Sequence, residues 1–480
     1  MRSSSIRAGA LASIAALTAL ACGACRAPVE GGPDPSASAA SARAPAPVAA
    51  SSASAVAKAA PPAKPLRKRP RNELELPTTP ASAFFENLDA QIASVARLAH
   101  ADGKSLPTWK LLVSLHLVRG KHRGDVEEIA VAREEATRCV LVLDSKDPEV
   151  YLLRADAERS LGRTKAARAD VERARRVGAE ADAVAAIEQE LDWDEGIYDK
   201  AATSIEQMAA AHRTPTTLAR LAKLHHDMGR TDDADRTFDE AEDLLVDNNP
   251  IPAASLEMQR GRHLLAVGRL DEALLFLRES WRRSPVCIAT LASLANALLL
   301  TGAAGGDEAL RLYEDAARRS SDPDVLGGLG RLLRARGRIG EADALKWRAM
   351  WKLNGLLSRF PEATYARAAS FFVDEGGEPP RAVELLRKDA ALRPTSAAWV
   401  ALARAQLATG HAAEARESID KALALPPVSA LRDWTAARAY ALVGDDARAR
   451  ELSANARAMN PIIDRIEPPL VPAGSVAPAR

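Results

Sequence analysis

Residue types that carry catalysis or metal binding form only a few close groupings in this chain. The three that stand out are a glycine-rich stretch, two adjacent histidines and a group of carboxylates, namely residues 302–307, His225 with His226, and Asp192, Asp194 and Glu195. The glycine-rich stretch lacks the Gly-Lys-Ser/Thr ending of a phosphate loop. Adjacent histidines on a helix point in different directions, whereas a zincin-type pair needs i, i+4 spacing. The carboxylates lack the alternation of a calcium loop, so we interpret them as solvated.

Nucleophilic chemistry has no better support. No cysteine has a nearby candidate base that the sequence alone justifies, and the chain contains no Gly-x-Ser-x-Gly elbow. The repeats described next occupy so much of the chain that no catalytic domain of ordinary size fits beside them. We therefore predict that the protein is not an enzyme and that it has no catalytic residues, cofactor or metal site.

The elements that hold these residues repeat along the chain about every 34 residues. Nine glycines mark the repeat: Gly162, Gly196, Gly229, Gly268, Gly302, Gly337, Gly377, Gly410 and Gly444. An alanine follows each of them within one or two helical turns, at Ala167, Ala201, Ala234, Ala273, Ala309, Ala342, Ala382, Ala415 and Ala449. Glycine enters the left-handed backbone region without a steric penalty, and alanine lets the next helix approach closely. The unit is therefore helix, tight turn, helix.

This pattern resembles the tetratricopeptide repeat. The copies that carry the resemblance most fully contain Trp399, Leu402, Gly410, Ala415, Ile419, Ala422 and Pro427, and Leu329, Gly330, Gly337, Ala342 and Ala349. The resemblance implies an all-α fold, a right-handed α-solenoid of about ten repeats over residues 106–463, with a divergent first copy around Trp109 and Gly120. Another α-solenoid family is the alternative fold.

Two cysteines lie within the repeats, Cys139 and Cys287. Stacked helices are about 8–10 Å apart, so about four intervening repeats separate these thiols by far more than a disulfide spans. We expect them to be unpaired, small and buried.

The amino terminus has the features of an export signal. Arg2 and Arg7 precede an uncharged Ala- and Leu-rich stretch, and residues 1–21 are predicted to be a signal peptide. Residues 18–22 resemble a bacterial lipobox, which implies lipidation of Cys22 and, with Gly23 at the next position, an outer-membrane lipoprotein of the cell envelope. The alternative is cleavage by ordinary signal peptidase, which would release a soluble periplasmic or secreted protein.

Residues 22–80 are rich in Ala, Pro and Ser and are predicted to be a disordered linker. Near its end lies a basic cluster, Lys64, Arg67, Lys68, Arg69 and Arg71, which we interpret as solvated, with contact to anionic lipid as the alternative. Residues 81–105 are predicted to contain an amphipathic capping helix with Ser82 as its N-cap. The tail, residues 464–480, is predicted to be disordered.

The family resemblance also implies a concave groove lined by the first helix of each repeat. The positions that would face it are Lys223, Arg262, Asn296, Arg331, Arg334, Phe371, Arg404 and Arg438, with Asp156 and Glu190 in the earlier repeats. These positions are acidic in the earlier repeats and mostly basic in the later ones. The whole chain has 65 basic and 64 acidic residues, so its net charge does not explain this segregation. We hypothesise that the basic half of the groove binds an acidic segment of a protein partner through arginine forks. The alternative is that an arginine-rich chain merely places arginine at polar positions.

These features favour a binding protein. We expect an adaptor or scaffold in the cell envelope, tethered to the membrane by a lipid anchor, and we keep a regulatory subunit of an envelope hydrolase or transferase as the alternative. The chaperone-binding clamp of the family is not expected, because Ala292 stands where a lysine is required and only Asn296 matches. Nucleic acid is a poor candidate because the net charge is balanced. The sequence leaves the partner and the oligomeric state open.

Overall fold

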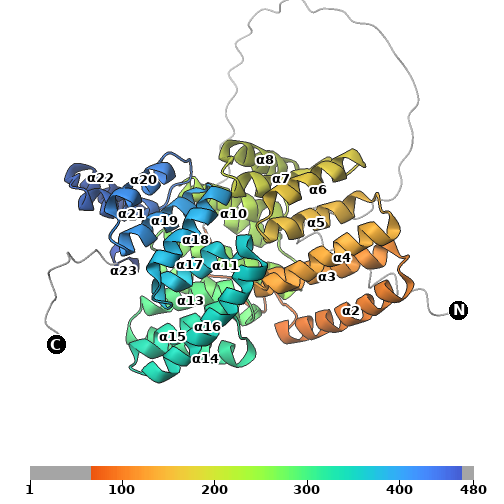
Figure 1. Ribbon diagram of the computed structural model, residues 1–480, viewed down its shortest axis with the longest axis horizontal. Coiled ribbons are helices and arrows are strands. Elements are labelled where there is room, and N and C mark those ends of the chain that lie inside the picture. The colour runs from red at the N-terminus through yellow and green to blue at the C-terminus, as the bar shows by residue number, and fades with distance from the viewer. Residues whose placement is uncertain (1–65, 468–480) are drawn as a thin grey trace, which may run out of the picture.

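The computed structural model describes residues 66–467, and every regular element in that range is a helix (Figure 1). In chain order these are α2 (Ala81–Asp102), α3 (Leu106–Arg123), α4 (Val126–Leu143), α5 (Pro148–Ser160), α6 (Thr164–Arg176), α7 (Ala181–Asp194), α8 (Tyr198–Ala211), α9 (Pro215–Asp227), α10 (Thr231–Leu244), α11 (Pro250–Ala266), α12 (Leu270–Arg283), α13 (Ile288–Leu299), α14 (Ala303–Arg319), α15 (Pro323–Ala335), α16 (Ile339–Arg359), α17 (Pro361–Asp374), α18 (Pro379–Leu392), α19 (Ser396–Ala408), α20 (Ala412–Leu423), α21 (Ala430–Leu442), α22 (Asp446–Met459) and α23 (Ile463–Ile466).

The helices pack as consecutive pairs, from α3 with α4 to α21 with α22, which confirms the predicted α-solenoid. All nine marker glycines have positive φ angles, between 65° and 90°, at the turn inside a pair. The alanines that follow them are buried, as at Ala167, where the exposed fraction is 0%. The glycine thus ends the first helix, and the alanine lets the second helix pack against it.

The first pair differs from the prediction. Its turn is at Gly124, which has a φ angle of 66°, and not at Gly120, which lies inside α3. A Cβ atom at Gly120 would lie 2.8 Å from Cγ1 of Ile129. Gly120 is therefore a point of close approach between α3 and α4.

The stack winds into a superhelix whose later pairs touch the earlier ones. Figure 1 shows it running from α2 in orange through α8, passing through the green helices, and returning as the cyan and blue helices. The intra-pair turns of the early repeats contact inter-pair junctions of the late ones. A Cβ atom at Gly162 would lie 2.9 Å from the backbone of Glu362, and the backbone N–H of Val428 donates to the carbonyl of Asp227 at 2.8 Å. We call this line of contacts the superhelical seam.

The seam continues at both ends of the late repeats. The amide of Asn460 donates to the carbonyls of Leu265 and Ala266 at 3.1 and 3.0 Å. Arg359 forms an ion pair with Glu127. The seam therefore closes one superhelical turn onto the next.

Residues 66–80, which we call the N-terminal strap, pack against α10, α11 and α12. This corrects the prediction that the linker is disordered up to residue 80 and that Arg67 and Arg71 of its basic cluster are solvated. Arg67 pairs with Asp243 at 3.1 Å, and its backbone N–H donates to Asp239 at 2.7 Å. Arg71 donates to the carbonyl of Leu245 at 2.7 Å, and Leu76 is only 4% exposed. The strap is held because acidic α10 complements its basic residues.

Two buried arginines bind the backbone of the strap. Arg260 donates to the carbonyl of Arg67 at 2.5 Å, and Arg283 donates to the carbonyls of Leu76 and Arg71 at 2.8 and 2.7 Å. Both side chains are fully buried. Since buried charges need partners, these arginines and the strap stabilise each other.

α2 covers one end of the stack and buries Phe85, Leu88 and Ile92. Its N-cap is Pro80, without a side-chain cap, so the prediction of Ser82 as the cap is wrong. At the other end, α23 and Glu467 contact the last repeats, which corrects the predicted start of the disordered tail at residue 464.

The signal peptide, Cys22 and the greater part of the predicted linker and tail lie outside the described residues. Within residues 66–467, no helix combines the length and the apolar character needed to cross a membrane. Cys139 and Cys287 are both free thiols, as predicted, but Cys287 is only half-buried, so the prediction of burial is wrong for this residue. Cys139 is buried, and burial raises the pKa of its thiol to about 11.

Candidate protein-binding groove

The first helices of the pairs form the inner surface of the superhelix. Neighbouring first helices contact one another, as α3 does with α5, α5 with α7 and α19 with α21, whereas second helices of the described chain contact each other less. A stack in which the first helices crowd together curves toward them. The first helices therefore line the inner surface on which the sequence analysis expects the groove.

The structure places all eight predicted groove residues on first helices. They are distributed over seven helices and a long stretch of the inner surface: Lys223 on α9, Arg262 on α11, Asn296 on α13, Arg331 and Arg334 on α15, Phe371 on α17, Arg404 on α19 and Arg438 on α21. The side chains of Lys223, Arg262, Asn296, Arg331, Arg334 and Arg404 are exposed, and Arg438 is half-buried.

Phe371 is an exception, because its ring belongs to the hydrophobic core. It is 7% exposed, packs edge-to-face on Phe372 with ring centroids 5.7 Å apart, and faces α15 where Gly327 leaves space. A bulky apolar side chain gains free energy by burial at this close helix contact. Phe371 is therefore a packing residue and not an open groove contact.

The arginines of the late groove are paired with carboxylates of this chain. Arg334 binds Asp343 at 2.6 Å, and Arg331 lies 3.5 Å from Glu375. Arg262, in contrast, forms no ion pair within the described residues. An acidic ligand of the late groove has to compete with these internal carboxylates, which the sequence did not indicate.

The earlier, acidic half of the groove is filled by a charge network. Arg159 lies 3.1 Å from Asp194, 3.7 Å from Asp156 and 3.8 Å from Glu190. Burial opposes ionisation of Glu190, but Arg159 and Arg220 outweigh it and hold the pKa of this carboxyl below its ordinary value. This half of the surface is internally neutralised.

At the end of the late groove, two predicted residues, Arg404 and Arg438, meet two that sequence reasoning missed, Glu467 and Trp434. Glu467 accepts a hydrogen bond from Arg404 at 2.5 Å and lies 3.5 Å from Arg438. The indole N–H of Trp434 donates to the backbone carbonyl of Glu467 at 2.8 Å. A cavity of about 330 Å³ adjoins these groups. Trp434 lies one helical turn before Arg438 and therefore on the same face of α21, which is the signal that could have identified it.

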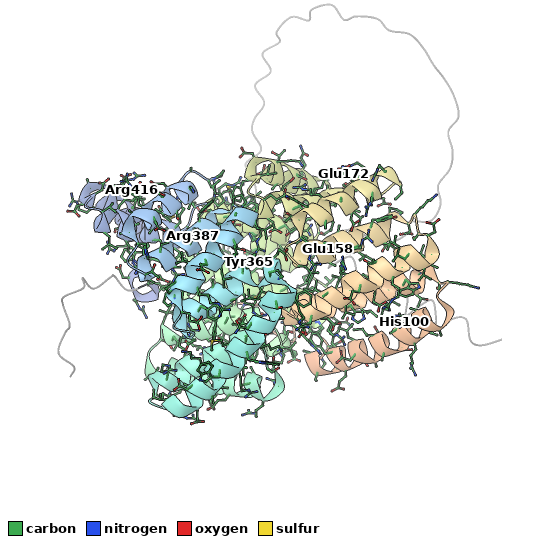
Figure 2. The ribbon with its side chains drawn as sticks, viewed as in Figure 1. His100, Glu158, Glu172, Tyr365, Arg387 and Arg416 are labelled. Carbon is green, nitrogen blue, oxygen red and sulfur yellow. The ribbon has the colours of Figure 1, made fainter. Side chains whose placement is uncertain are left out.

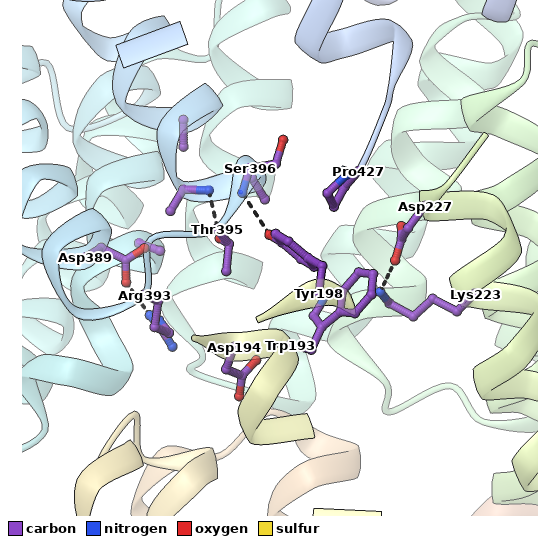
Figure 3. Close-up of a pocket in the computed structure, with 14 residues that line it drawn as sticks. Trp193, Asp194, Tyr198, Lys223, Asp227, Asp389, Arg393, Thr395, Ser396 and Pro427 are labelled. Atoms are coloured by element: carbon purple, nitrogen blue, oxygen red, sulfur yellow. Dashed lines mark hydrogen bonds and ion pairs between the residues drawn. The ribbon is translucent and has the colours of Figure 1, made fainter. Parts of the chain in front are cut away.

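A second cavity, of about 420 Å³, lies at the seam (Figure 3). Tyr198 reaches across it to the start of α19, where its hydroxyl accepts a hydrogen bond from the backbone N–H of Ser396 at 3.0 Å. The predicted groove residue Lys223 also lines this cavity, with its ammonium 4.6 Å from the centre of the Trp193 ring and 2.5 Å from Asp227. Lys223 therefore lies where the two superhelical turns meet.

The other groupings singled out in the sequence have structural partners. Gly302 forms a turn, as predicted. His226 contacts His263 on α11 at 3.0 Å, and no cluster among residues 66–467 has the ligands for a metal ion. The carboxylates are not solvated as we predicted, because Asp192 is 1% exposed and binds Arg168 at 2.6 Å.

The packed helix pairs define an α-helical repeat protein with a solenoid fold. More particularly, residues 396–428 match the family model of the tetratricopeptide repeat, so α19, α20 and the following junction form such a repeat. This is the segment that carried one of the fullest resemblances in the sequence.

Two solved structures are similar over much of the chain, and both likenesses are distant. The structure of Naa15/Naa10 bound to HypK-THB has 14% identity and a TM-score of 0.25, with 78% of this chain and 67% of that chain covered. A monomeric mutant of IFIT1 with Gppp-AAAA has 14% identity and a TM-score of 0.36, with 77% and 94% covered. No curated protein matches this chain.

Proposed function

We propose that this protein is an exported, lipid-anchored adaptor that binds an acidic segment of a protein partner along the inner surface of its late repeats. It acts by docking and not by catalysis. The anchor is Cys22, and the site of action is the bacterial cell envelope, with the outer membrane favoured by Gly23.

The observation that carries the proposal is the set of exposed basic side chains on first helices. Arg262, Arg331, Arg334 and Arg404 project from α11, α15 and α19 along one surface of a rigid superhelix. Arginine presents a planar fork that matches a carboxylate with two hydrogen bonds. A rigid groove with spaced forks suits an extended acidic segment better than a small molecule.

A charge-reversal experiment tests the proposal. We expect Arg331→Glu with Arg404→Glu to abolish recovery of the partner in pull-downs from solubilised membranes, because each change replaces an attractive contact with a repulsive one. The matched control is Arg387→Glu on α18, a second helix whose position Figure 2 labels. Recovery of the same partner by the groove variant and the control would contradict the proposal. A soluble enzyme whose rate changes on binding would instead support a regulatory subunit.

A further inference from the structure

We infer that the inner surface of α19 and α21 is a binding site for a glutamate in an extended peptide, and that Glu467 of this chain occupies it as an internal competitor. The inference rests on the proposed adaptor function, because it names the kind of residue that this part of the groove binds and how access to it is controlled.

The side chain of Glu467 is held by two guanidinium groups. Nη2 of Arg404 lies 2.5 Å from Oε1, and Nη1 of Arg438 lies 3.5 Å from Oε2. The two carboxylate oxygens thus face two different arginines on adjacent first helices. Charge-assisted contacts of this kind are roughly twice as strong as neutral hydrogen bonds, so the site favours a carboxylate over an amide.

The backbone of Glu467 is bound as well. Nε1 of Trp434 donates to its carbonyl at 2.8 Å, while the backbone N–H of Glu467 donates to the carbonyl of Ile463 at 2.8 Å and caps the end of α23. Trp434 is 4% exposed and packs in one cluster with Ile463 and Ile466 of α23, so the segment that ends in Glu467 helps to bury the indole. Contacts to both a side chain and a main-chain carbonyl are what a groove makes with an extended peptide.

Glu467 does not use the whole capacity of the site. Nε of Arg438 is buried and has no hydrogen-bond partner among residues 66–467. Burial and the nearby charge of Arg404 lower the pKa of Arg438, although Glu467 opposes this shift. Another carboxylate that lines the adjoining cavity is Asp374, which lies 3.9 Å from Arg331. Arg404 and Arg438 thus face the single carboxylate of Glu467, and this arginine pair retains an excess of positive charge.

The adjoining cavity of about 330 Å³ offers space for a neighbouring side chain of a ligand. Its walls are mostly small or apolar, including Val373, Leu386, Ala401, Ala405 and Ala408. A bound peptide that fills this cavity and presents a carboxylate to the arginines would make more contacts than Glu467 makes. Such a peptide can displace Glu467, although the covalent link gives Glu467 a high effective concentration.

Peptide binding to the full chain tests this inference. The probe is a fluorescently labelled synthetic peptide with the sequence of residues 462–473, and fluorescence anisotropy gives its Kd. We expect the Glu467→Gln protein to bind the peptide about tenfold more tightly than the wild type, because the internal competitor is weakened. We also expect a peptide with glutamine in place of its glutamate to lose about tenfold in affinity. Adding Arg404→Glu to the Glu467→Gln protein should abolish binding.

Two matched variants serve as controls. Glu451→Gln on α22 changes an exposed residue outside the groove of the wild type and should leave its Kd unchanged. Arg387→Glu on α18 also changes an exposed residue outside the groove, and adding it to the Glu467→Gln protein should leave the Kd of that protein unchanged. Circular dichroism melts verify that each variant folds. Equal affinity of wild type and Glu467→Gln, no binding to Glu467→Gln, or equal affinity for the two peptides would overturn the inference. The pull-down tests the adaptor proposal separately. If recovery of the partner depends on the groove arginines but the peptide does not bind, the adaptor proposal stands and this inference fails. If the peptide binds but recovery of the partner does not depend on the groove arginines, the adaptor proposal alone fails.

Discussion

At the scale of single residues, the marker glycines fall into two groups. All have positive φ angles, so any side chain there strains the backbone. Only those of the early repeats also face the superhelical seam. A Cβ atom at Gly162 would lie 2.9 Å from the backbone of Glu362, whereas a Cβ atom at Gly410 would meet nothing within 4 Å. The two groups therefore separate the local role of glycine from its role in the superhelix.

This difference gives a stability prediction. Gly410→Ala should lower the free energy of unfolding by about 1–2 kcal/mol, the cost of a left-handed alanine. Gly162→Ala should cost at least about 1 kcal/mol more, because the added methyl group overpacks the seam. Urea unfolding followed by circular dichroism measures both changes. Equal costs would show that the seam does not form in solution.

At the scale of elements, α2 is fixed at its contact with the end of α3. His122 stacks on Phe85 with ring centroids 5.5 Å apart and lies 2.5 Å from the hydroxyl of Ser284. Burial, assisted by the charge of Arg123, lowers the pKa of His122 from the ordinary 6.5 to about 4. His122 is therefore neutral in the folded protein at pH values where the unfolded chain binds a proton.

The pH dependence of stability follows from this shift. Between about pH 6.5 and pH 4 the unfolded chain binds more protons at this site, so the free energy of unfolding should fall as the pH decreases through that window. We expect His122 to contribute about 1–2 kcal/mol of destabilisation between pH 7 and pH 5. His122→Gln should reduce this difference, and His411→Gln, which changes an exposed residue, should not. An unchanged pH profile in His122→Gln would contradict the assigned environment.

The helix pairs could be predicted from the sequence because their signals are local. Gly410 and Ala415 lie within one pair and specify its turn and its close packing without reference to the rest of the chain. The strap could not be predicted in this way. Arg67 was interpreted as a solvated linker residue because its partner Asp243 lies on α10, far along the sequence.

The sequence predicted which helices carry the groove arginines, but not that carboxylates of this chain contact them. The register placed Arg404 and Arg438 correctly on first helices, because the repeat has a fixed period. Their carboxylate partner, Glu467, lies in a segment whose proline-rich composition predicted disorder. Trp434 carried a signal only in relation to Arg438 on the same helix face. Composition does not indicate which tail residue returns to the groove.

At the scale of the whole molecule, the seam makes the superhelix a single closed body. Contacts from Glu127 with Arg359 through Asp227 with Val428 to Leu265 with Asn460 join the early and late repeats at several points. A closed superhelix keeps its inner surface in a fixed shape. The groove therefore presents its arginines at fixed spacings, which favours one class of extended ligand.

The measurement that tests the central claim most directly is site-specific photo-cross-linking in cells, followed by mass spectrometry. A photoreactive residue is placed on the inner surface at Asn296 or Ala408 and, as a control, on the outer surface at Lys388; all three positions are exposed. We predict that both inner positions cross-link one partner protein through a segment rich in aspartate and glutamate, and that Lys388 does not. Cross-links to the same protein from Lys388 alone, or none from the inner positions, would contradict the account.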